Sequence, residues 1–286
     1  MAYIIHILTL VGIYSIMVMG FNLSAGMAGL MNLSHMTFAA IGGYTSAILT
    51  SRYDLNWILA FVAGILVAIL SSFIWSVLAA RMEGDQFALI SLMIGIVVYI
   101  IALNWKELTR GALGIAGLQR PDFASSMEQY ALLVWLCVVV CYGFVQKIEH
   151  SPFGRALTAI RDDSIAARVL GKNVAMLRVK TLMISAGIAG SAGVLFAHYI
   201  QFLQPRSLYL ETLIILLAAL VIGGLGSTKG AIAGVFIMFL IAEPLRFLPI
   251  PDAIVGALRL MIYALLMIIV ILKKPRGLFG KIAFDV

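Results

Sequence analysis

The sequence predicts an all-α integral membrane protein with about nine transmembrane helices, between eight and ten, in one domain over residues 1–286. Its residues are 63% hydrophobic and 12% charged, whereas about a quarter of the residues of a soluble domain are charged. The first acidic or basic residue is Arg52, and one crossing takes about 20 residues, so the opening stretch crosses more than once or re-enters. No basic segment precedes the first apolar run, so we expect that run to be a retained helix and not a signal peptide.

Apolar runs place the expected spans along the chain. Residues 22–32 contain Ser24, Gly26 and Gly29, which predict a broken or re-entrant element near the second span. The sequence GGLGSTKG at 223–230 separates two short runs, which predicts two full spans or, as an alternative, a re-entrant hairpin. The expected spans are 3–22, 29–50, 56–80, 86–105, 129–146, 179–203, 209–225, 230–248 and 254–272.

The basic residues predict the orientation of these spans. Cytoplasmic loops carry an excess of Lys and Arg, which indicates a cytoplasmic C-terminus and, with nine spans, an external N-terminus. This distribution also accounts for the net charge of +7 without any binding of nucleic acid. Thirteen of the 20 basic residues would lie inside: Arg81, Lys147, Arg155, Arg161, Arg168, Lys172, Arg178, Lys180, Lys229, Lys273, Lys274, Arg276 and Lys281.

The chain shows no energy source of its own. Glu211 and Glu243 lie near span ends, and no Asp, Glu or Lys lies near a span centre, which argues against an ion-coupled carrier unless carbonyl and hydroxyl oxygens bind sodium. GGLGSTKG lacks the second Gly and the final Ser or Thr of a P-loop, and GALGIAG at 111–117 lacks the dinucleotide-binding spacing. Cys137 and Cys141 have no further metal ligands nearby and fit helix packing.

The polar segment 147–178 predicts a short helical hairpin on the cytoplasmic face. Ser151 before Pro152 is typical of a helix start, Asp162 and Asp163 can cap a second helix, and Gly171 followed by Asn173 suits a helix end. A solvated amphipathic loop against lipid headgroups is the alternative interpretation. Apolar residues recur at helical spacing: Phe153, Leu157, Ile160, Ala167 and Leu170.

The stretch IAARVLG at 165–171 resembles the E-A-A-x-x-x-G coupling loop of ABC importer permeases, with Ile165 at the Glu position. The whole chain resembles the branched-chain amino acid ABC permease family, closest to its LivM-type subunit. The blocks that carry this resemblance are NLSHMTFAAIGGYTSAIL at 32–49, GDQFALISL at 84–92, TRGALGIAGLQRP at 109–121, SPFGRALTAIRDDSIAARVLGKNV at 151–174, VIGGLGSTKGAIAG at 221–234 and KKPRGLFG at 273–280.

The resemblance implies a non-enzymatic permease subunit of an importer in a bacterial or archaeal cytoplasmic membrane. Its implied partners are a LivH-type permease, two cytoplasmic ATPases that bind ATP and Mg, and an extracytoplasmic substrate-binding protein, while this chain itself holds no cofactor. The implied substrates are branched-chain amino acids (leucine, isoleucine and valine) or related amino acids, with urea or short amides as the alternative. An ion-driven carrier, or a membrane enzyme using Asp162 and Asp163, are the competing classes.

Two sets of candidate residues follow. The resemblance implies that the hairpin residues couple to the ATPases: Arg155, Arg161, Asp162, Asp163, Ala166, Ala167, Arg168 and Gly171. Neutral polar residues of the broken region are expected to line the substrate pathway, or alternatively to hydrogen-bond between helices: Asn22, Ser24, Asn32, Ser34 and His35.

Two further expectations concern later spans. Ser185, Ala189 and Gly193, with Ala186 and Gly190 alongside, predict a close helix interface within the subunit or, as the alternative, a dimer contact. Arg259 is expected to extend from the last span toward the outer surface, with an external gate as the alternative.

Overall fold

The computed structural model describes residues 1–79, 81–82, 84–243, 252–274 and 276–280. Within these residues the fold is helical apart from one antiparallel pair of two-residue strands. Seven of the described helices are long and apolar enough to cross a membrane, which confirms the all-helical, multi-pass class. The predicted span end at 248, Arg246 and Lys281 lie outside the described residues.

The first half of the chain supplies α1 to α5, two 3-10 turns and one strand. α1 (Ala2–Phe21) continues as a π-helix, η1 (Asn22–Met27), and α2 is His35–Tyr53. The remaining elements of this half are α3 (Trp57–Ala79), α4 (Gly84–Asn104), α5 (Lys106–Thr109), η2 (Gly111–Leu113), β1 (Ile115–Ala116) and η3 (Asp122–Ala124).

The second half begins with the long helix α6 (Met127–His150). Two short helices follow, α7 (Pro152–Asp162) and α8 (Ser164–Val169), and then the longest helix, α9 (Val174–Ile200). The chain ends with β2 (Phe202–Leu203), η4 (Pro205–Leu208), α10 (Leu210–Gly223), α11 (Thr228–Ala242) and α12 (Asp252–Lys273).

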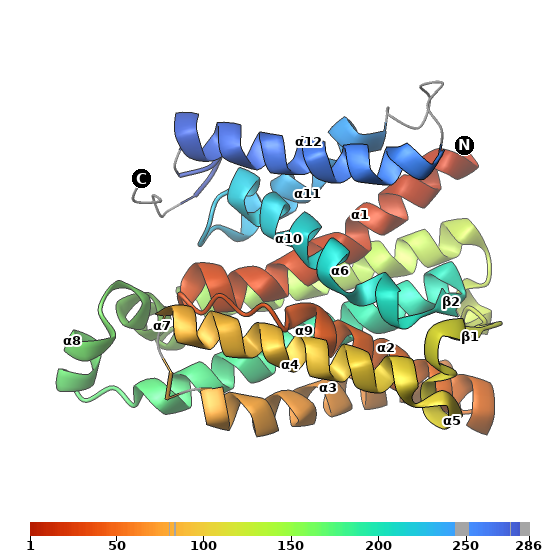
Figure 1. Ribbon diagram of the computed structural model, residues 1–286, viewed down its shortest axis with the longest axis horizontal. Helices are drawn as coiled ribbons and strands as arrows, with labels where there is room; N and C mark the ends of the chain where they lie inside the picture. Colours follow the sequence, from red (N-terminus) through yellow and green to blue (C-terminus); the bar gives the residue numbers. More distant parts are fainter. Residues whose placement is uncertain (80, 83, 244–251, 275, 281–286) are drawn as a thin grey trace.

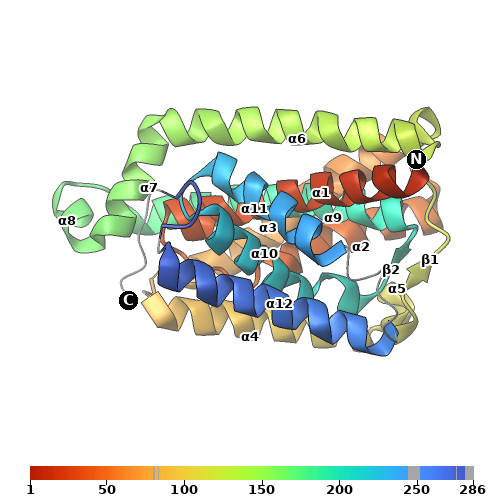
Figure 2. The same cartoon turned by 90° about the horizontal axis from the view of Figure 1, so that it is seen from above.

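The long helices run side by side along one axis, so the molecule has two ends (Figure 1). We call the end with α7 and α8 the hairpin end, and the end with β1, β2 and α5 the loop end. α1 starts at the loop end, and α12 finishes at the hairpin end. Seen from above, α6 covers one flank while α4 and α12 lie on the opposite flank (Figure 2).

The core is built around α9, which contacts α1, α2 and α3. A Cβ added to Gly193 would lie 1.8 Å from the backbone oxygen of Ala39, and one added to Gly42 would lie 2.6 Å from the Cα of Gly190. Small residues therefore let the backbones of α2 and α9 touch, as expected for membrane helices. The predicted interface through Ser185, Ala189 and Gly193 within the subunit is confirmed, because all three residues are buried and α9 packs against α1, α2 and α3.

The chain leaves regular helix between Met27 and His35, where the sequence predicted a break. The Leu33 amide donates to Ser91 Oγ of α4 at 2.9 Å, and the Leu30 amide donates to the Ser24 carbonyl at 2.8 Å. Non-helical backbone is tolerated at membrane depth only where protein or water satisfies its polar groups. Here α4 and η1 supply part of those hydrogen bonds.

GGLGSTKG forms the predicted turn, between α10 and α11. Gly224 and Gly226 have φ of 105° and 77°, which favours glycine, and Ser227 caps the N-terminus of α11 by accepting from the Gly230 amide at 3.1 Å. The amides of Leu278 and Phe279 donate to the last carbonyls of α10, at Ile222 and Gly223. The C-terminal segment 276–280 therefore caps the end of α10.

Candidate functional site

The hairpin of α7 and α8 is fixed by the caps that its sequence predicts. Ser151 Oγ accepts from the Gly154 amide at 3.2 Å, with Pro152 at the first helical position. Asp163 Oδ1 accepts from the amides of Ile165 and Ala166, both at 2.9 Å, and so starts α8. The predicted start of each helix is thus confirmed.

The end of α8 has a glycine-dependent geometry. Gly171 has φ of 79°, its amide donates to the Arg168 carbonyl, and the Lys172 amide donates to the Ala167 carbonyl. This pair of bonds with a left-handed glycine is a Schellman motif. The expectation that Asn173 belongs to the same helix end is wrong, because its Oδ1 accepts from the Met176 amide and caps the start of α9.

The hairpin has an inner and an outer face. Ile160, Ala167 and Val174 form a small buried cluster, and Leu157 is buried in the main core. Ala166 is exposed, so the two alanines of the predicted coupling motif face different ways. On the outer face Ile165, Val169 and Leu170 are 68%, 83% and 77% exposed.

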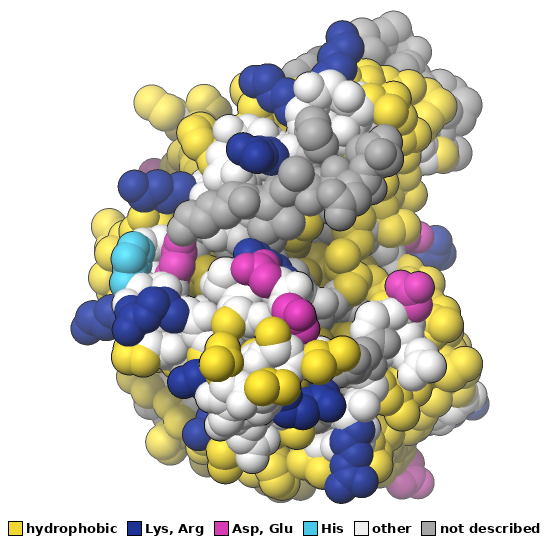
Figure 3. Space-filling view, turned by 90° about the vertical axis from the view of Figure 1, so that its left-hand side faces the viewer, with side chains coloured by type: hydrophobic (Ala, Val, Ile, Leu, Met, Phe, Trp, Pro, Cys, Tyr) yellow, Lys and Arg dark blue, Asp and Glu magenta, His cyan; other side chains and the backbone are white. Residues whose placement is uncertain are grey.

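We call Ile165, Ala166, Val169 and Leu170 the α8 patch. Figure 3 views the molecule from the hairpin end, where hydrophobic side chains lie among Lys, Arg, Asp and Glu. An apolar group rimmed by polar residues marks an interaction surface in soluble regions of a protein.

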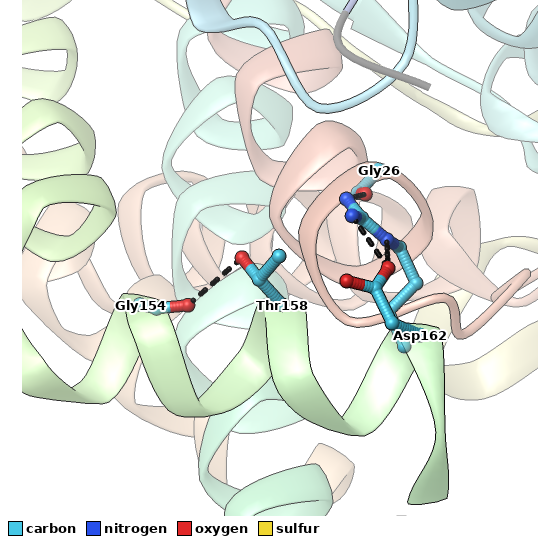
Figure 4. A network of polar contacts seen from close by, with 5 residues as sticks. Gly26, Gly154, Thr158 and Asp162 are labelled. Atoms are coloured by element: carbon cyan, nitrogen blue, oxygen red, sulfur yellow. Dashed lines mark hydrogen bonds and ion pairs between the residues drawn. The ribbon is translucent and has the colours of Figure 1, made fainter. Parts of the chain in front are cut away.

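Arg161 joins the hairpin to the broken region of the membrane domain. Figure 4 shows two residues that it contacts, Gly26 and Asp162. Its Nη1 donates to the backbone oxygen of Gly26, in η1, at 3.3 Å, and its Nη2 lies 2.7 Å from Asp162 Oδ1. A Cβ on Gly29, whose φ is 69°, would lie 2.8 Å from Arg161 Cγ. The glycines of the broken region therefore leave space for the guanidinium side chain.

η1 also contacts the turn between α10 and α11. Asn22 Oδ1 accepts from the Gly226 amide at 3.0 Å, and a Cβ on Gly26 would lie 2.6 Å from the same nitrogen. π-Helical turns occur frequently at functional sites. A continuous set of contacts thus leads from α7 through η1 to the turn that ends α10.

The other predicted coupling residues lie at the surface of the hairpin. Arg155 Nη1 donates to the His150 carbonyl at 3.3 Å, Asp162 is 63% exposed, and Arg168 and Gly171 are exposed. α7 itself is braced by Thr158, whose Oγ1 donates to the Gly154 carbonyl at 3.2 Å (Figure 4).

The predicted pathway residues are grouped together, but they are buried. Asn22, Ser24 and His35 are fully buried, and Asn32 and Ser34 are 2% and 3% exposed. His35 Nε2 lies 3.0 Å from the Met17 carbonyl and its Nδ1 lies 3.2 Å from Ser185 Oγ. Asn32 Oδ1 accepts from Ser34 Oγ at 2.6 Å. The contacts of His35 join α2 to α1 and α9, whereas the bond between Asn32 and Ser34 is local. A pathway role for the five residues stays a prediction.

Sequence reasoning missed several residues that position the hairpin. Arg178 is 6% exposed and its Nη1 donates to the Met82 carbonyl at 2.9 Å, which ties α9 to the turn before α4. Glu149 Oε2 accepts from Thr228 Oγ1 at 2.9 Å and ties α6 to α11. Two glycines in an apolar stretch, Gly26 and Gly29, indicate that another segment can approach the backbone closely. They do not indicate that Arg161 is the neighbour.

Two ion pairs lie toward the loop end. Arg259 Nη2 lies 3.5 Å from Glu243 Oε2, and Arg206 Nη2 lies 2.7 Å from Glu211 Oε1. Arg259 therefore joins α12 to the end of α11. In the described part of the chain no three His, Cys, Asp or Glu residues are grouped in a way that would hold a metal ion.

The chain is similar in sequence to known membrane transport proteins. Residues 3–271 match the family described as branched-chain amino acid transport system / permease component. The high-affinity branched-chain amino acid transport system permease protein LivM of Escherichia coli K12 is 31% identical, over 96% of this chain and 69% of LivM.

More distant relatives match over a similar extent. The corresponding protein LivH of Salmonella typhimurium LT2 is 28% identical over 96% of this chain and 93% of LivH. A probable LivM of Methanocaldococcus jannaschii is 24% identical over 94% of this chain and 91% of its own length. No solved structure matches the chain. This chain is a multi-pass membrane protein that belongs to the family of permease components of branched-chain amino acid transport systems.

Proposed function

We propose that the chain forms half of the translocation pathway of an ABC importer for leucine, isoleucine and valine. The observation that carries the proposal is the hairpin of α7 and α8, which presents the α8 patch outward and holds Gly26 of the membrane domain through Arg161. A rigid element with an exposed docking face and a buried anchor suits the transfer of motion.

In this proposal two cytoplasmic ATPases supply the energy. ATP and Mg bind to the ATPases, and this chain binds no cofactor. ATP binding closes the ATPase pair, displaces the hairpin, and shifts η1 and the α10–α11 turn through Arg161 and Asn22. The pathway would then open alternately toward each end.

The remaining partners would occupy the other surfaces. A LivH-type permease would pair with an exposed flank, and an extracytoplasmic binding protein would dock on the loop end. That end has a cavity of about 580 Å³ lined by charged side chains, among them Arg52, Asp54, Arg110, Arg120 and Asp122. The proposed location is a bacterial or archaeal cytoplasmic membrane with the hairpin and C-terminus in the cytoplasm.

We also propose that α2 and α11 cross the bilayer with the seven long helices, which gives nine crossings. α2 has 19 residues and α11 has 15, and both lie beside the long helices. Nine crossings place the N-terminus outside, in agreement with its position at the loop end.

Reconstitution in lipid vesicles tests this function. The chain is combined with a LivH-type permease, two ATPases and a binding protein, and leucine uptake is measured with and without internal ATP. ATP-dependent uptake supports the proposal, and urea or short amides serve as competing substrates. Uptake by the chain alone in an ion gradient would overturn it in favour of an ion-driven carrier.

A further inference from the structure

A charged cavity lies at the loop end, where α2 ends and α3 begins. Its volume is about 580 Å³. Three segments line it: most of residues 50–58 between α2 and α3, Arg110 after α5, and residues 115–123 from β1 to η3. Figure 1 shows α5 and β1 at the end opposite α8. The proposed orientation therefore places this cavity on the outer side of the membrane.

Contacts of the segment 50–58 hold the walls of the cavity together. The Arg52 side chain donates through Nη2 to two backbone carbonyls of α5. The ring of Trp57 packs edge-on against the ring of Phe123, with centroids 5.8 Å apart. The segment between α2 and α3 thus contacts both of the other walls.

Five charged side chains, of both signs, line the cavity. They are Arg52, Arg110, Arg120, Asp54 and Asp122. The side chains of Arg110, Asp54 and Asp122 are exposed and form no hydrogen bond or ion pair with any residue that the structure describes. The cavity therefore offers one cation and two anions to a ligand.

The backbone at Arg110 indicates that its charge is kept for a purpose other than folding. Arg110 ends α5 with φ of 62°, a left-handed conformation that Gly adopts at the lowest cost. Asp54 ends α2 with φ of 47°. Among the described residues other than Gly, three have a positive φ, and two of the three line this cavity. Residues with such backbone conformations concentrate at ligand sites.

The lining matches the chemistry of an aliphatic amino acid. Such a ligand needs a cation for its carboxylate, an anion for its ammonium group and apolar surface for its side chain. Arg110 supplies the cation, and Asp54 and Asp122 supply the anions. The rings of Trp57 and Phe123 supply the apolar surface. A lining of one sign would favour an ion of the opposite sign, whereas this mixed lining suits a zwitterion.

We propose that this cavity receives the free amino acid from the extracytoplasmic binding protein and holds it before it enters the pathway. Arg110 pairs with its carboxylate, and Asp54 and Asp122 pair with its ammonium group. Its aliphatic side chain lies against Trp57 and Phe123. The inference rests on the proposed function, which it deepens by adding a substrate site at the outer end of the permease.

The exposure of these charges suits a site that binds its ligand briefly. Ion pairs between solvent-exposed groups are weak, because water and salt screen them. The cavity of about 580 Å³ lies within the range of roughly 300–1,000 Å³ that is usual for small-molecule sites. Several weak contacts can therefore orient the amino acid and still release it to the pathway.

The first test asks whether the cavity recognises both charges of the ligand. In a background with Cys137→Ala and Cys141→Ala, Ala116→Cys places a thiol in the lining. Two permeases and two ATPases are reconstituted without the binding protein, and labelling by a small thiol reagent is timed. Saturating leucine should slow the labelling about tenfold. At the same concentration isocaproate, which lacks the ammonium group, and isoamylamine, which lacks the carboxylate, should slow it less than about twofold.

Charge variants then separate the two kinds of partner. With Arg110→Gln, leucine should slow the labelling no more than isoamylamine does, because its carboxylate has lost a partner. With Asp54→Asn and Asp122→Asn together, leucine should slow it no more than isocaproate does. The controls Lys106→Gln and Glu128→Gln remove exposed charges at the same end but outside the lining, and leucine should protect them as it protects the unmodified lining.

Three results would overturn the site. Labelling that leucine does not slow, in an importer that shows ATP-dependent uptake, would do so and leave the importer function standing. Equal slowing by leucine and by both analogues would show apolar binding without recognition of charge. Slowing by the ligand-free binding protein, but not by leucine, would show that a segment of that protein fills the cavity. Slowing by leucine alone, in an assembly without ATP-dependent uptake, would support the site and contradict the proposed function.

Discussion

Arg161 shows how one residue can serve both parts of the molecule. Its side chain is 18% exposed, and its guanidinium contacts both Asp162 on the hairpin and the Gly26 carbonyl in η1. A partly buried charge-assisted bond is stronger than a neutral one, so Arg161 is suited to transmit force between the two segments.

Replacing Arg161 should uncouple ATP hydrolysis from transport. We expect Arg161→Gln to reduce leucine uptake about tenfold, equivalent to about 1.4 kcal/mol, while ATP hydrolysis by the assembly continues. The uptake per ATP hydrolysed is the quantity to measure. Lys147→Gln is the control, since Lys147 is exposed near the end of α6 and does not belong to the predicted coupling residues. An unchanged ratio for Arg161→Gln would contradict the coupling role.

Gly193 is important because it has no side chain and so lets the backbones of α2 and α9 touch. We expect Gly193→Ala to lower stability by about 1–3 kcal/mol, since its Cβ would overlap the Ala39 carbonyl. Thermal unfolding in detergent measures the effect. Gly143→Ala in α6 meets nothing within 4 Å, so it should leave stability unchanged or slightly raised.

At the scale of elements, two neighbouring residues of α8 have different roles, one on the exposed α8 patch and one in the packing of the hairpin. Ala166 is exposed, whereas Ala167 is 2% exposed and packs against Ile160 and Val174. A carboxylate at each position therefore has a different effect, although the two residues are neighbours.

We expect Ala166→Glu to prevent copurification of the ATPases while the hairpin stays folded. Ala167→Glu should unfold the hairpin, because an unpaired charge would be buried. Hydrogen exchange over residues 152–173 distinguishes the two results, and Gly171→Asp should resemble Ala167→Glu because φ at Gly171 is 79°. Normal copurification with Ala166→Glu would show that the α8 patch is not the docking face.

The non-helical stretch 28–34 is stabilised by a hydrogen bond to α4. Ser91→Ala removes the acceptor of the Leu33 amide and should cost roughly 1–3 kcal/mol. Ser71→Ala is the matched control, because Ser71 Oγ donates to the Ala68 carbonyl of its own helix. Equal unfolding temperatures for the two variants would show that water replaces Ser91.

For the whole molecule, the proposed orientation can be read by labelling from outside. In a background with Cys137→Ala and Cys141→Ala, Ala2→Cys and Asp54→Cys should react with an impermeant thiol reagent on intact cells. Ile165→Cys should react only after the cells are made permeable, because the proposed orientation places the hairpin in the cytoplasm. External labelling of Ile165→Cys would reverse the orientation.

The sequence predicted those features that depend on local chemistry. Apolar runs located the helices, and Ser151, Pro152 and Asp163 located the starts of α7 and α8, because caps act within one turn. Asn173 was assigned to the wrong helix because the same residue type suits both ends. The contacts of Arg161 with Gly26 and of Asn22 with Gly226 join residues 135 and 204 positions apart, and no local pattern encodes them.

The segment 28–34 also constrains how the protein enters the bilayer during synthesis. Its Leu33 amide pairs with Ser91, and its neighbour His35 contacts Ser185, so these partners emerge from the ribosome long after the segment itself. Unpaired backbone groups are unstable in lipid. In the proposed topology, in which α2 is the second crossing, we expect this segment to stay in the aqueous or protein-lined interior of the insertion machinery until α4, and finally α9, arrive to complete it.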